Sequence, residues 1–184
     1  SCAPFTRCGG DAARGAESRA GEDVVTRRLV VAAAQTGPVA EPGDAATADA
    51  AHAMLDEAAG RGVQLLTFSE LFLAPFFPNR LDANFARYFM REDDPLIAAL
   101  RARACAARIA LVLPFAEFTG AGHFNSALLQ DADGRIVGRY RKTHIPAYFP
   151  DDKAGGTGSY EKFYFTPGDA LPVFTLAGVR VGVQ

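Results

Sequence analysis

Two strand-like runs meet at a tight turn in the segment Phe124-Asn125-Ser126-Ala127-Leu128-Leu129-Gln130-Asp131-Ala132-Asp133-Gly134-Arg135-Ile136-Val137-Gly138-Arg139-Tyr140-Arg141-Lys142. The polar stretch 131–134 is typical of a hairpin turn, so we predict strands over 124–130 and 135–141. Side chains alternate between the two faces of a strand. Alternation places Lys142 with Tyr140 on the less polar face, and the neighbouring arginines on the other.

Before this hairpin, short apolar strands alternate with helices. Asp44 has the chemistry of an N-cap for the first helix, whose apolar residues fall on one face. The predicted elements are strands over 29–34, 63–69 and 109–113, helices over 45–59 and 95–108, and a second hairpin from 173–175 and 179–183. This order predicts an α/β chain with a mixed sheet.

Composition excludes several classes of protein. The chain has 184 residues, of which 49% are hydrophobic and 22% are charged, with a net charge of -2. These values are typical of a globular domain, and they argue against a basic nucleic-acid binder or a polybasic membrane-surface protein. No apolar run approaches the roughly 18 residues that span a bilayer. The odd and low count of three cysteines argues against a disulfide scaffold, so a reducing, cytoplasmic location is expected.

The first 27 residues differ from the rest. They are rich in Ala, Gly, Arg and acidic residues, and they match neither a secretory signal nor an acid-poor transit peptide. We predict that 1–27 is a flexible tail or an artefact of start-site choice, and that 28–184 belongs to one domain. Cys2 and Cys8 lie in this tail, and their spacing is not that of a zinc site.

Glu70 and Lys142 stand out within the predicted domain. Glu70 follows the strand 63–69, where alternation places it with Leu66 and Phe68 on an apolar face. A carboxylate there needs a partner or a function. From these segments alone, a salt-bridged strand end and an ordinary surface lysine remain open alternatives to a catalytic pair.

Several motifs give these residues a context. The run Lys142-Thr143-His144-Ile145-Pro146 is the most specific of them. The other motifs are Ala33-Ala34-Gln35, Phe68-Ser69-Glu70-Leu71-Phe72, Phe124-Asn125-Ser126-Ala127, Asp133-Gly134-Arg135-Ile136-Val137-Gly138-Arg139-Tyr140-Arg141 and Tyr160-Glu161-Lys162-Phe163-Tyr164-Phe165-Thr166-Pro167-Gly168-Asp169. Together they resemble the nitrilase superfamily of carbon–nitrogen hydrolases over about residues 29–184. The segment 160–169 resembles the branch that cleaves N-carbamoyl groups, which includes N-carbamoylputrescine amidases, N-carbamoyl-D-amino acid hydrolases and β-ureidopropionases.

The resemblance implies an α-β-β-α sandwich that carries a Glu–Lys–Cys constellation. Glu70 matches the general base, and Lys142 matches the lysine that stabilises the tetrahedral oxyanion. Glu161 resembles the additional glutamate that holds the lysine and the substrate. His144 and Asn125 lie in matched segments and are expected at the substrate-binding site, with His144 lining the pocket and Asn125 ordering the end of the sheet.

The family's nucleophilic cysteine has no match within this chain. By the motif it would fall about two residues beyond Gln184, so the chain is expected to be a truncated N-terminal part that is inactive by itself. Cys105 lies in a predicted helix and is expected to be a small buried residue. Ser69 stands where many members have proline. The segment 151–158 is expected to be an inserted, flexible loop near the entrance of the pocket.

The function implied by the resemblance is hydrolysis of a small N-carbamoyl amine or amino acid to an amine, CO2 and NH3. Phe76-Phe77-Pro78 and Tyr148-Phe149 would line an apolar pocket entrance. No metal or cofactor is expected, because the three histidines are scattered and no dinucleotide motif is present. The family also implies a homodimer or higher homo-oligomer. A nitrilase, an aliphatic amidase and an inactive truncated product remain alternatives.

Overall fold

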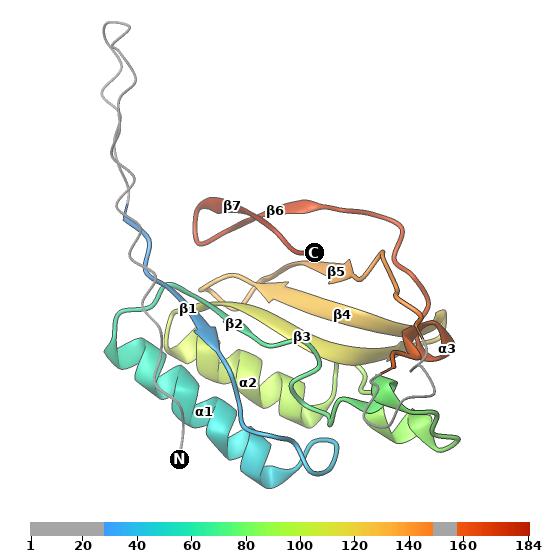
Figure 1. Cartoon of the computed structure of the whole chain (residues 1–184). Helices are drawn as coiled ribbons and strands as arrows, with labels where there is room; N and C mark the ends of the chain where they lie inside the picture. Colours follow the sequence, from blue (N-terminus) through green and yellow to red (C-terminus); the bar gives the residue numbers. More distant parts are fainter. Residues whose placement is uncertain (1–27, 149–157) are drawn as a thin grey trace, which may run out of the picture.

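The computed structural model describes residues 28–148 and 158–184 (Figure 1). The predictions for the first 27 residues, and for nearly all of the loop 151–158, lie outside these described residues. Two helices, a five-stranded sheet and a two-stranded hairpin form successive layers, which are seen edge-on in Figure 1.

The sheet has the mixed topology that the sequence predicts. Its strand order is β1-β2-β3-β4-β5. Strands β1, β2 and β3 pair in parallel, whereas β4 is antiparallel to both β3 and β5. The carboxyl ends of β2, β3 and β5 and the start of β4 therefore share one edge of the sheet. The strands are β1 (Val31–Ala34), β2 (Leu65–Phe68), β3 (Ala110–Thr119), β4 (Gly122–Gln130) and β5 (Ile136–Arg141).

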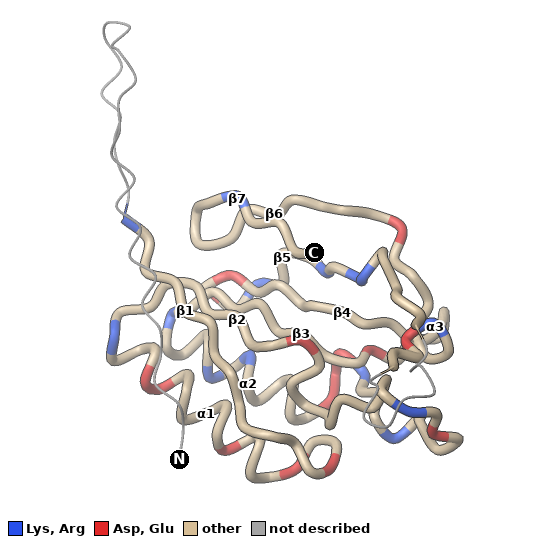
Figure 2. The backbone as a smooth tube through the Cα atoms, in the orientation of Figure 1, with Lys and Arg blue, Asp and Glu red and all other residues tan. Residues whose placement is uncertain are grey.

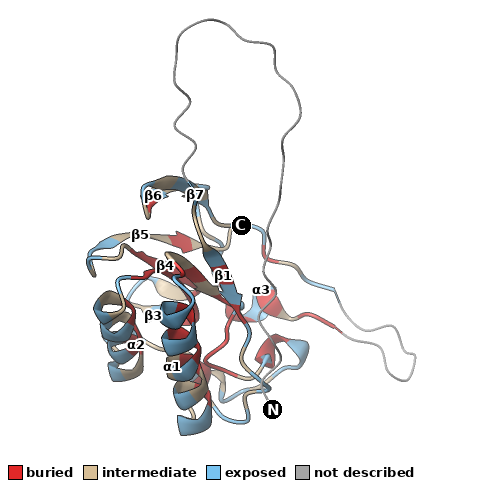
Figure 3. Cartoon of the chain, turned by 90° about the vertical axis from the view of Figure 1, so that its left-hand side faces the viewer, coloured by how far each residue is buried: buried red, intermediate tan, exposed pale blue. Residues whose placement is uncertain are grey.

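Both long helices begin at an aspartate N-cap, of which Asp44 was predicted from the sequence and Asp94 was not. Helix α1 spans Ala45–Gly60, and the Asp44 carboxylate accepts a hydrogen bond from the Thr47 amide at 2.6 Å. Helix α2 spans Pro95–Ala106, and Asp94 accepts from the Leu96 amide at 2.9 Å. Both helices cover one face of the sheet and expose their outer faces (Figure 3). Their apolar stripes, together with alternate residues of β1 to β3 and with Leu128 of β4, form the largest buried cluster of the described residues.

Strand β3 is longer than the sequence predicts. A strand was expected to stop before Pro114, yet β3 continues to Thr119. Proline lacks the amide that a ladder needs, so it is tolerated where one neighbour is absent. Strand β2 pairs with β3 only as far as Val112, while Pro114 pairs with Ala127 of β4. The proline therefore lies beyond the ladder between β2 and β3.

The second predicted hairpin covers the other face of the sheet. Strands β6 (Val173–Leu176) and β7 (Val179–Gly182) pair only with each other among the described residues. Phe174 and Leu176 of the hairpin pack into a cluster with alternate residues of β3, β4 and β5. The approach is closest at Gly138, where an added Cβ would lie 2.2 Å from the Phe174 ring.

Replacing Gly138 by alanine is expected to destabilise the protein by about 1–3 kcal/mol, because the new methyl group overlaps the Phe174 ring and the hairpin must shift. The measurement is urea-induced unfolding of the parent and the variant. Gly37→Ala is the matched control, since nothing lies within 4 Å of its added Cβ. Equal stability of the two alanine variants would contradict this packing.

Within the described parts of the chain, none of the helices has the length and apolar character needed to cross a bilayer.

Candidate active site

Four of the five site residues predicted from the sequence meet at the edge of the sheet where β2, β3 and β5 end. Glu70 lies two residues past β2, and Lys142 directly follows β5. Asn125 lies near the start of β4, and Glu161 opens the one-turn helix α3 (Glu161–Tyr164). Figure 2 shows charged positions at this end of the sheet, beside α3. The carboxyl ends of strands are where α/β proteins commonly bind ligands.

Lys142 joins two carboxylates. Its Nζ atom donates to Glu70 Oε1 at 2.8 Å and to Glu161 Oε2 at 2.9 Å. The Asn125 amide also donates to Glu70 Oε1, at 2.6 Å. The Lys142 and Glu70 side chains are 24% and 48% exposed, whereas Glu161 is almost fully buried. A fixed cation beside a solvent-reaching carboxylate is suited to acid–base chemistry and to stabilising a developing negative charge.

The face predicted for Glu70 is wrong. Leu66 and Phe68 are buried against the helices, but Glu70 contacts Asn125 and Lys142, which belong to the opposite face. Alternation fails because β2 ends at Phe68 and the chain turns at Leu71, which has a left-handed φ of 53°. The apolar surroundings that alternation implied for Glu70 are therefore replaced by a polar, half-exposed position.

A hydrophobic cluster at the same edge holds this turn. We call it the edge cluster, and its members are Leu71, Ala74, Phe77, Tyr88, Ala116, Ile145, Tyr164 and Phe165. A left-handed leucine costs about 1–2 kcal/mol, so burial must compensate for it. Leu71 is 2% exposed, and its carbonyl accepts from the Ala74 amide at 3.0 Å. Each of the three charged site residues has a member of the edge cluster close to it in sequence. Leu71 follows Glu70, Ile145 lies near Lys142, and Tyr164 lies near Glu161. The cluster therefore anchors each of the three segments.

Glu161 is held from two sides. Its Oε1 accepts from the Ser159 hydroxyl at 3.3 Å, while Oε2 accepts from Lys142. Its short helix is fixed by Tyr164, whose hydroxyl donates to the Arg80 carbonyl at 2.5 Å and accepts from the Asp82 amide at 2.7 Å. A buried carboxylate needs such partners. Ser159 was not among the predicted site residues, because a serine in a loop gives no periodic signal.

The charge of Lys142 depends on its two partners. Burial alone would lower the pKa of the Lys142 ammonium. The hydrogen bonds and charges of Glu70 and Glu161 outweigh burial, so the pKa of Lys142 is raised above its usual value. Lys142 therefore carries a positive charge at neutral pH, as a residue that stabilises an oxyanion must.

This raised pKa predicts a pH-dependent contribution of Lys142 to stability. The contribution is fully present below the unfolded lysine pKa of about 10.4, and is lost as pH rises through the higher pKa of the folded protein. The difference in unfolding free energy between the parent and Lys142→Met is therefore expected to become less favourable to the parent above about pH 10.5. Denaturant unfolding from pH 9 to 11.5 measures this difference. A difference that does not change with pH would contradict the prediction.

His144 is not brought into the four-residue cluster by any contact among the described residues. It is exposed, and its Nδ1 lies 2.9 Å from the hydroxyl of its neighbour Thr143. Of the predicted apolar entrance, Phe77 is instead a core residue, which is 0% exposed and stacked on Tyr88. Phe76 and Tyr148 are about half exposed. Phe149 lies outside the described residues.

Cys105 does not belong to the site. It lies in α2, and its Sγ would be 2.9 Å from a Cβ added at Gly134, in the turn between β4 and β5. That turn is at the end of β5 opposite to Lys142. Over residues 28–148 and 158–184, no three His, Cys, Asp or Glu side chains are grouped so as to hold a metal ion.

Comparison with known proteins identifies the fold and its family. The sequence pattern of the family described as "Carbon-nitrogen hydrolase" matches residues 30–184. The structure resembles the crystal structure of a carbon-nitrogen hydrolase from Helicobacter pylori G27, with a TM-score of 0.68 and 25% identity, over 84% of this chain and 50% of that one. The chain therefore belongs to the carbon–nitrogen hydrolase family, with the nitrilase-type α/β fold predicted from its motifs.

Two relatives of known activity are similar in sequence. An N-carbamoylputrescine amidase from Arabidopsis thaliana is 33% identical over 136 residues, which are 73% of this chain and 43% of that protein. A citrullinase from Francisella tularensis is 32% identical over 129 residues, covering 69% of this chain and 42% of that protein. The chain thus spans less than half the length of these relatives.

Proposed function

We propose that the protein to which this chain belongs hydrolyses small N-carbamoyl compounds. The observation that carries the proposal is the Lys142 ammonium held between Glu70 and Glu161 at the carboxyl edge of a carbon–nitrogen hydrolase sheet. The names of the two relatives supply the substrate class, since N-carbamoylputrescine and citrulline both end in a carbamoylamino group.

In this proposal, Glu70 is the general base. Among the described side chains, Asn125 and Lys142 contact its carboxylate, and both donate their hydrogen bonds to Oε1. Oε2 is thereby left to take the proton of the nucleophile and to pass it to the departing amine. The nucleophile we propose is a cysteine supplied by chain beyond residue 184, so residues 1–184 are expected to be inactive alone. A thiolate is needed because a carbamoyl carbon is a weak electrophile.

Lys142 has the second role. When the thiolate adds to the carbamoyl carbon, negative charge develops on the carbonyl oxygen, and a fixed cation there stabilises the transition state. The carbon–nitrogen bond then breaks, and the amine leaves with the proton from Glu70. Water, which gives a proton to Glu70, attacks the carbamoyl thioester and releases the cysteine thiolate, which takes the proton back from Glu70. The carbamic acid that forms decomposes to CO2 and NH3. Glu161 holds Lys142, and Asn125 holds Glu70, in this geometry.

Ammonia release by the purified full-length protein tests the proposal. N-carbamoylputrescine, citrulline and N-carbamoyl amino acids are compared with an aliphatic nitrile and a simple aliphatic amide. Turnover of at least one N-carbamoyl compound, with kcat/KM at least tenfold above the nitrile and the amide, is expected. Turnover of the nitrile or the amide alone would reject the proposed substrate class and favour a nitrilase or an aliphatic amidase. Loss of activity on replacing the predicted cysteine by serine would support its role as the nucleophile.

A further inference from the structure

A buried carboxylate lies on the face of the sheet opposite to the candidate active site. Glu117 of β3 is 1% exposed and follows the buried residues Leu111, Leu113 and Phe115 on the helix-covered face. Its Oε2 accepts from the Ser126 hydroxyl at 2.7 Å and from Arg141 Nε at 2.8 Å, and Arg141 also reaches Oε1 at 3.2 Å. One side chain of β3 therefore contacts both β4 and β5.

The residues held by Glu117 are the chain neighbours of the site residues. Ser126 follows Asn125, and Arg141 precedes Lys142, so each pair points to opposite faces of its strand. Ser126 and Arg141 are register partners, and the Lys142 amide donates to the Asn125 carbonyl at 2.8 Å. The contacts of Glu117 on the helix-covered face and the candidate active site on the opposite face therefore depend on the same two backbone segments of β4 and β5.

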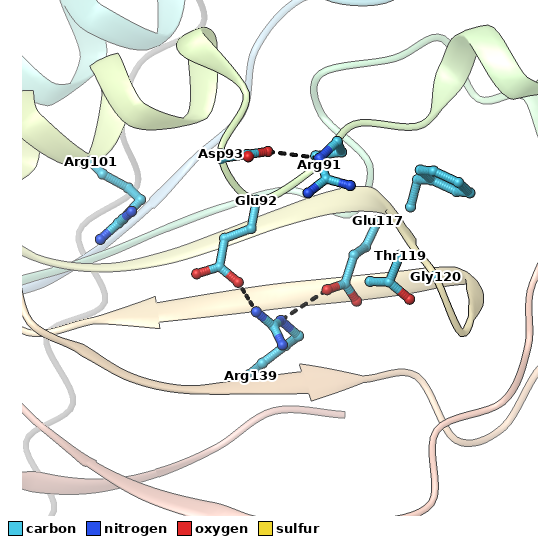
Figure 4. A pocket seen from close by; sticks show the side chains of 9 residues that line it. Arg91, Glu92, Asp93, Arg101, Glu117, Thr119, Gly120 and Arg139 are labelled. Atoms are coloured by element: carbon cyan, nitrogen blue, oxygen red, sulfur yellow. Dashed lines mark hydrogen bonds and ion pairs between the residues drawn. The ribbon is translucent and has the colours of Figure 1, made fainter.

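Glu117 also balances two cations. Arg139 Nε lies 3.0 Å from Glu117 Oε1, and the Arg139 guanidinium is also ion-paired with Glu92, as Figure 4 shows. Burial, with a smaller effect of the nearby Arg141 charge, lowers the pKa of Arg139 below its usual value. Arg141 is further held over the Phe124 ring at 3.8 Å. Without Glu117, two partly buried guanidinium groups would repel one another at the end of β5.

This network is separate from the substrate site. Glu92, Glu117 and Arg139 of this network line a surface pocket of about 380 Å³, whose walls include both acidic and basic residues. None of Glu70, Lys142 and Glu161 lines that pocket. Any effect of Glu117 on the reaction must therefore pass through the strands rather than through direct contact with substrate.

We propose that Glu117 is a positioning residue, which fixes the ends of β4 and β5 so that Asn125 and Lys142 meet Glu70 on the opposite face of the sheet. This inference rests on the proposed function for its kinetic consequence, whereas its geometric part concerns Lys142 alone. A misplacement of about 1 Å in an active site can reduce turnover about 100-fold, so a small shift of Lys142 has a measurable effect.

The test compares three variants of the full-length protein. Glu117→Gln removes the charge that joins the strands, and Ser126→Ala removes one hydrogen bond while keeping every charge. Glu92→Gln is the control, because it also removes a negative charge, and among the described residues the ion pair of Glu92 is with Arg139 rather than with Ser126 or Arg141. We expect kcat to fall about 10- to 100-fold in Glu117→Gln and about three- to tenfold in Ser126→Ala, with KM changed less than threefold. Glu92→Gln should stay within twofold of the parent.

A second readout does not require activity. The titration of Lys142 is followed by NMR of its labelled side chain, assigned by its loss in Lys142→Met. Displacement of Lys142 from its carboxylates is expected to lower its pKa toward the usual lysine value of about 10.4 in both Glu117→Gln and Ser126→Ala, and not in Glu92→Gln. Thermal unfolding of each variant separates this effect from a loss of folded protein.

The outcomes separate the two claims. If the parent hydrolyses none of the substrates but the Lys142 pKa falls in both test variants, the proposed function fails and the positioning role stands. If the titration of Lys142 and the kcat of folded protein match the parent in Glu117→Gln and Ser126→Ala, the positioning role is rejected. A poorly folding Glu117→Gln leaves Ser126→Ala to decide by the same criteria.

Discussion

Replacing Lys142 by methionine in the full-length protein is expected to lower kcat about 100- to 1000-fold on its best N-carbamoyl substrate. The reason is the loss of the only side chain that the structure places as a cation between Glu70 and Glu161 within 28–148 and 158–184. Methionine keeps much of the side-chain volume without the charge. The measurement is steady-state ammonia release by the parent and the variant.

Lys142→Met also leaves Glu161 buried with Ser159 as its remaining side-chain partner among the described residues, so a loss of stability is expected as well. A double variant with Glu161→Gln separates the two effects. It should recover part of the lost stability, because the unpaired buried charge is gone, while remaining inactive. Lys162→Met is the matched control, since Lys162 is exposed on α3. Less than a tenfold fall in kcat for Lys142→Met would rule out the oxyanion role.

Replacing Glu70 by glutamine is expected to lower kcat about 100- to 10,000-fold, which is the range that general acid–base catalysis contributes. The glutamine carbonyl can still accept the hydrogen bonds from Asn125 and Lys142 that Glu70 Oε1 accepts now. The fold and the position of Lys142 are therefore expected to persist, while the group that takes the proton is lost. Steady-state kinetics and thermal unfolding are measured on the same preparations.

The control for this substitution is Glu57→Gln, which removes an exposed carboxylate of α1 that pairs with Arg61. Surface ion pairs contribute little to stability, so this variant should match the parent in both measurements. A Glu70→Gln protein that keeps more than a tenth of the parent kcat would show that the proton is accepted elsewhere. A variant that has lost its folded structure would instead assign Glu70 a structural role.

Elements that depend on neighbours in the chain were predictable from the sequence. The Asp44 cap, the helix 45–60, the turn 131–134 and the hairpin that it joins all form as their local patterns indicate. Caps and turns involve hydrogen bonds between residues a few positions apart, and the hairpin follows from the turn that joins its two strands. Local sequence patterns are therefore enough to predict them. The separation of Lys142 from Arg139 and Arg141 on opposite faces of β5 also follows from alternation alone.

The candidate site residues were selected from motifs, but the motifs did not predict that four of them lie in contact. Glu70 lies 55 residues from Asn125 and 72 from Lys142, and Glu161 lies 19 residues beyond Lys142. No local pattern states which strands are neighbours, and alternation predicted the wrong face for Glu70. Glu117 continues the alternation of Leu111, Leu113 and Phe115, but its partners lie on two other strands, so the sequence of β3 alone does not indicate its role.

The sequence by itself therefore determined the α/β class, the Asp44 helix cap, the hairpins and the chemical types of the candidate catalytic groups. The distances between those groups depend on the order and register of β2 to β5, on the left-handed turn at Leu71, and on the packing of the edge cluster. The physical reason is that the hydrophobic pattern of a strand indicates which of its own side chains are buried. It does not indicate which other strand lies beside it. Contact between segments far apart in the chain is set by burial shared among several elements, which arises only when they pack together.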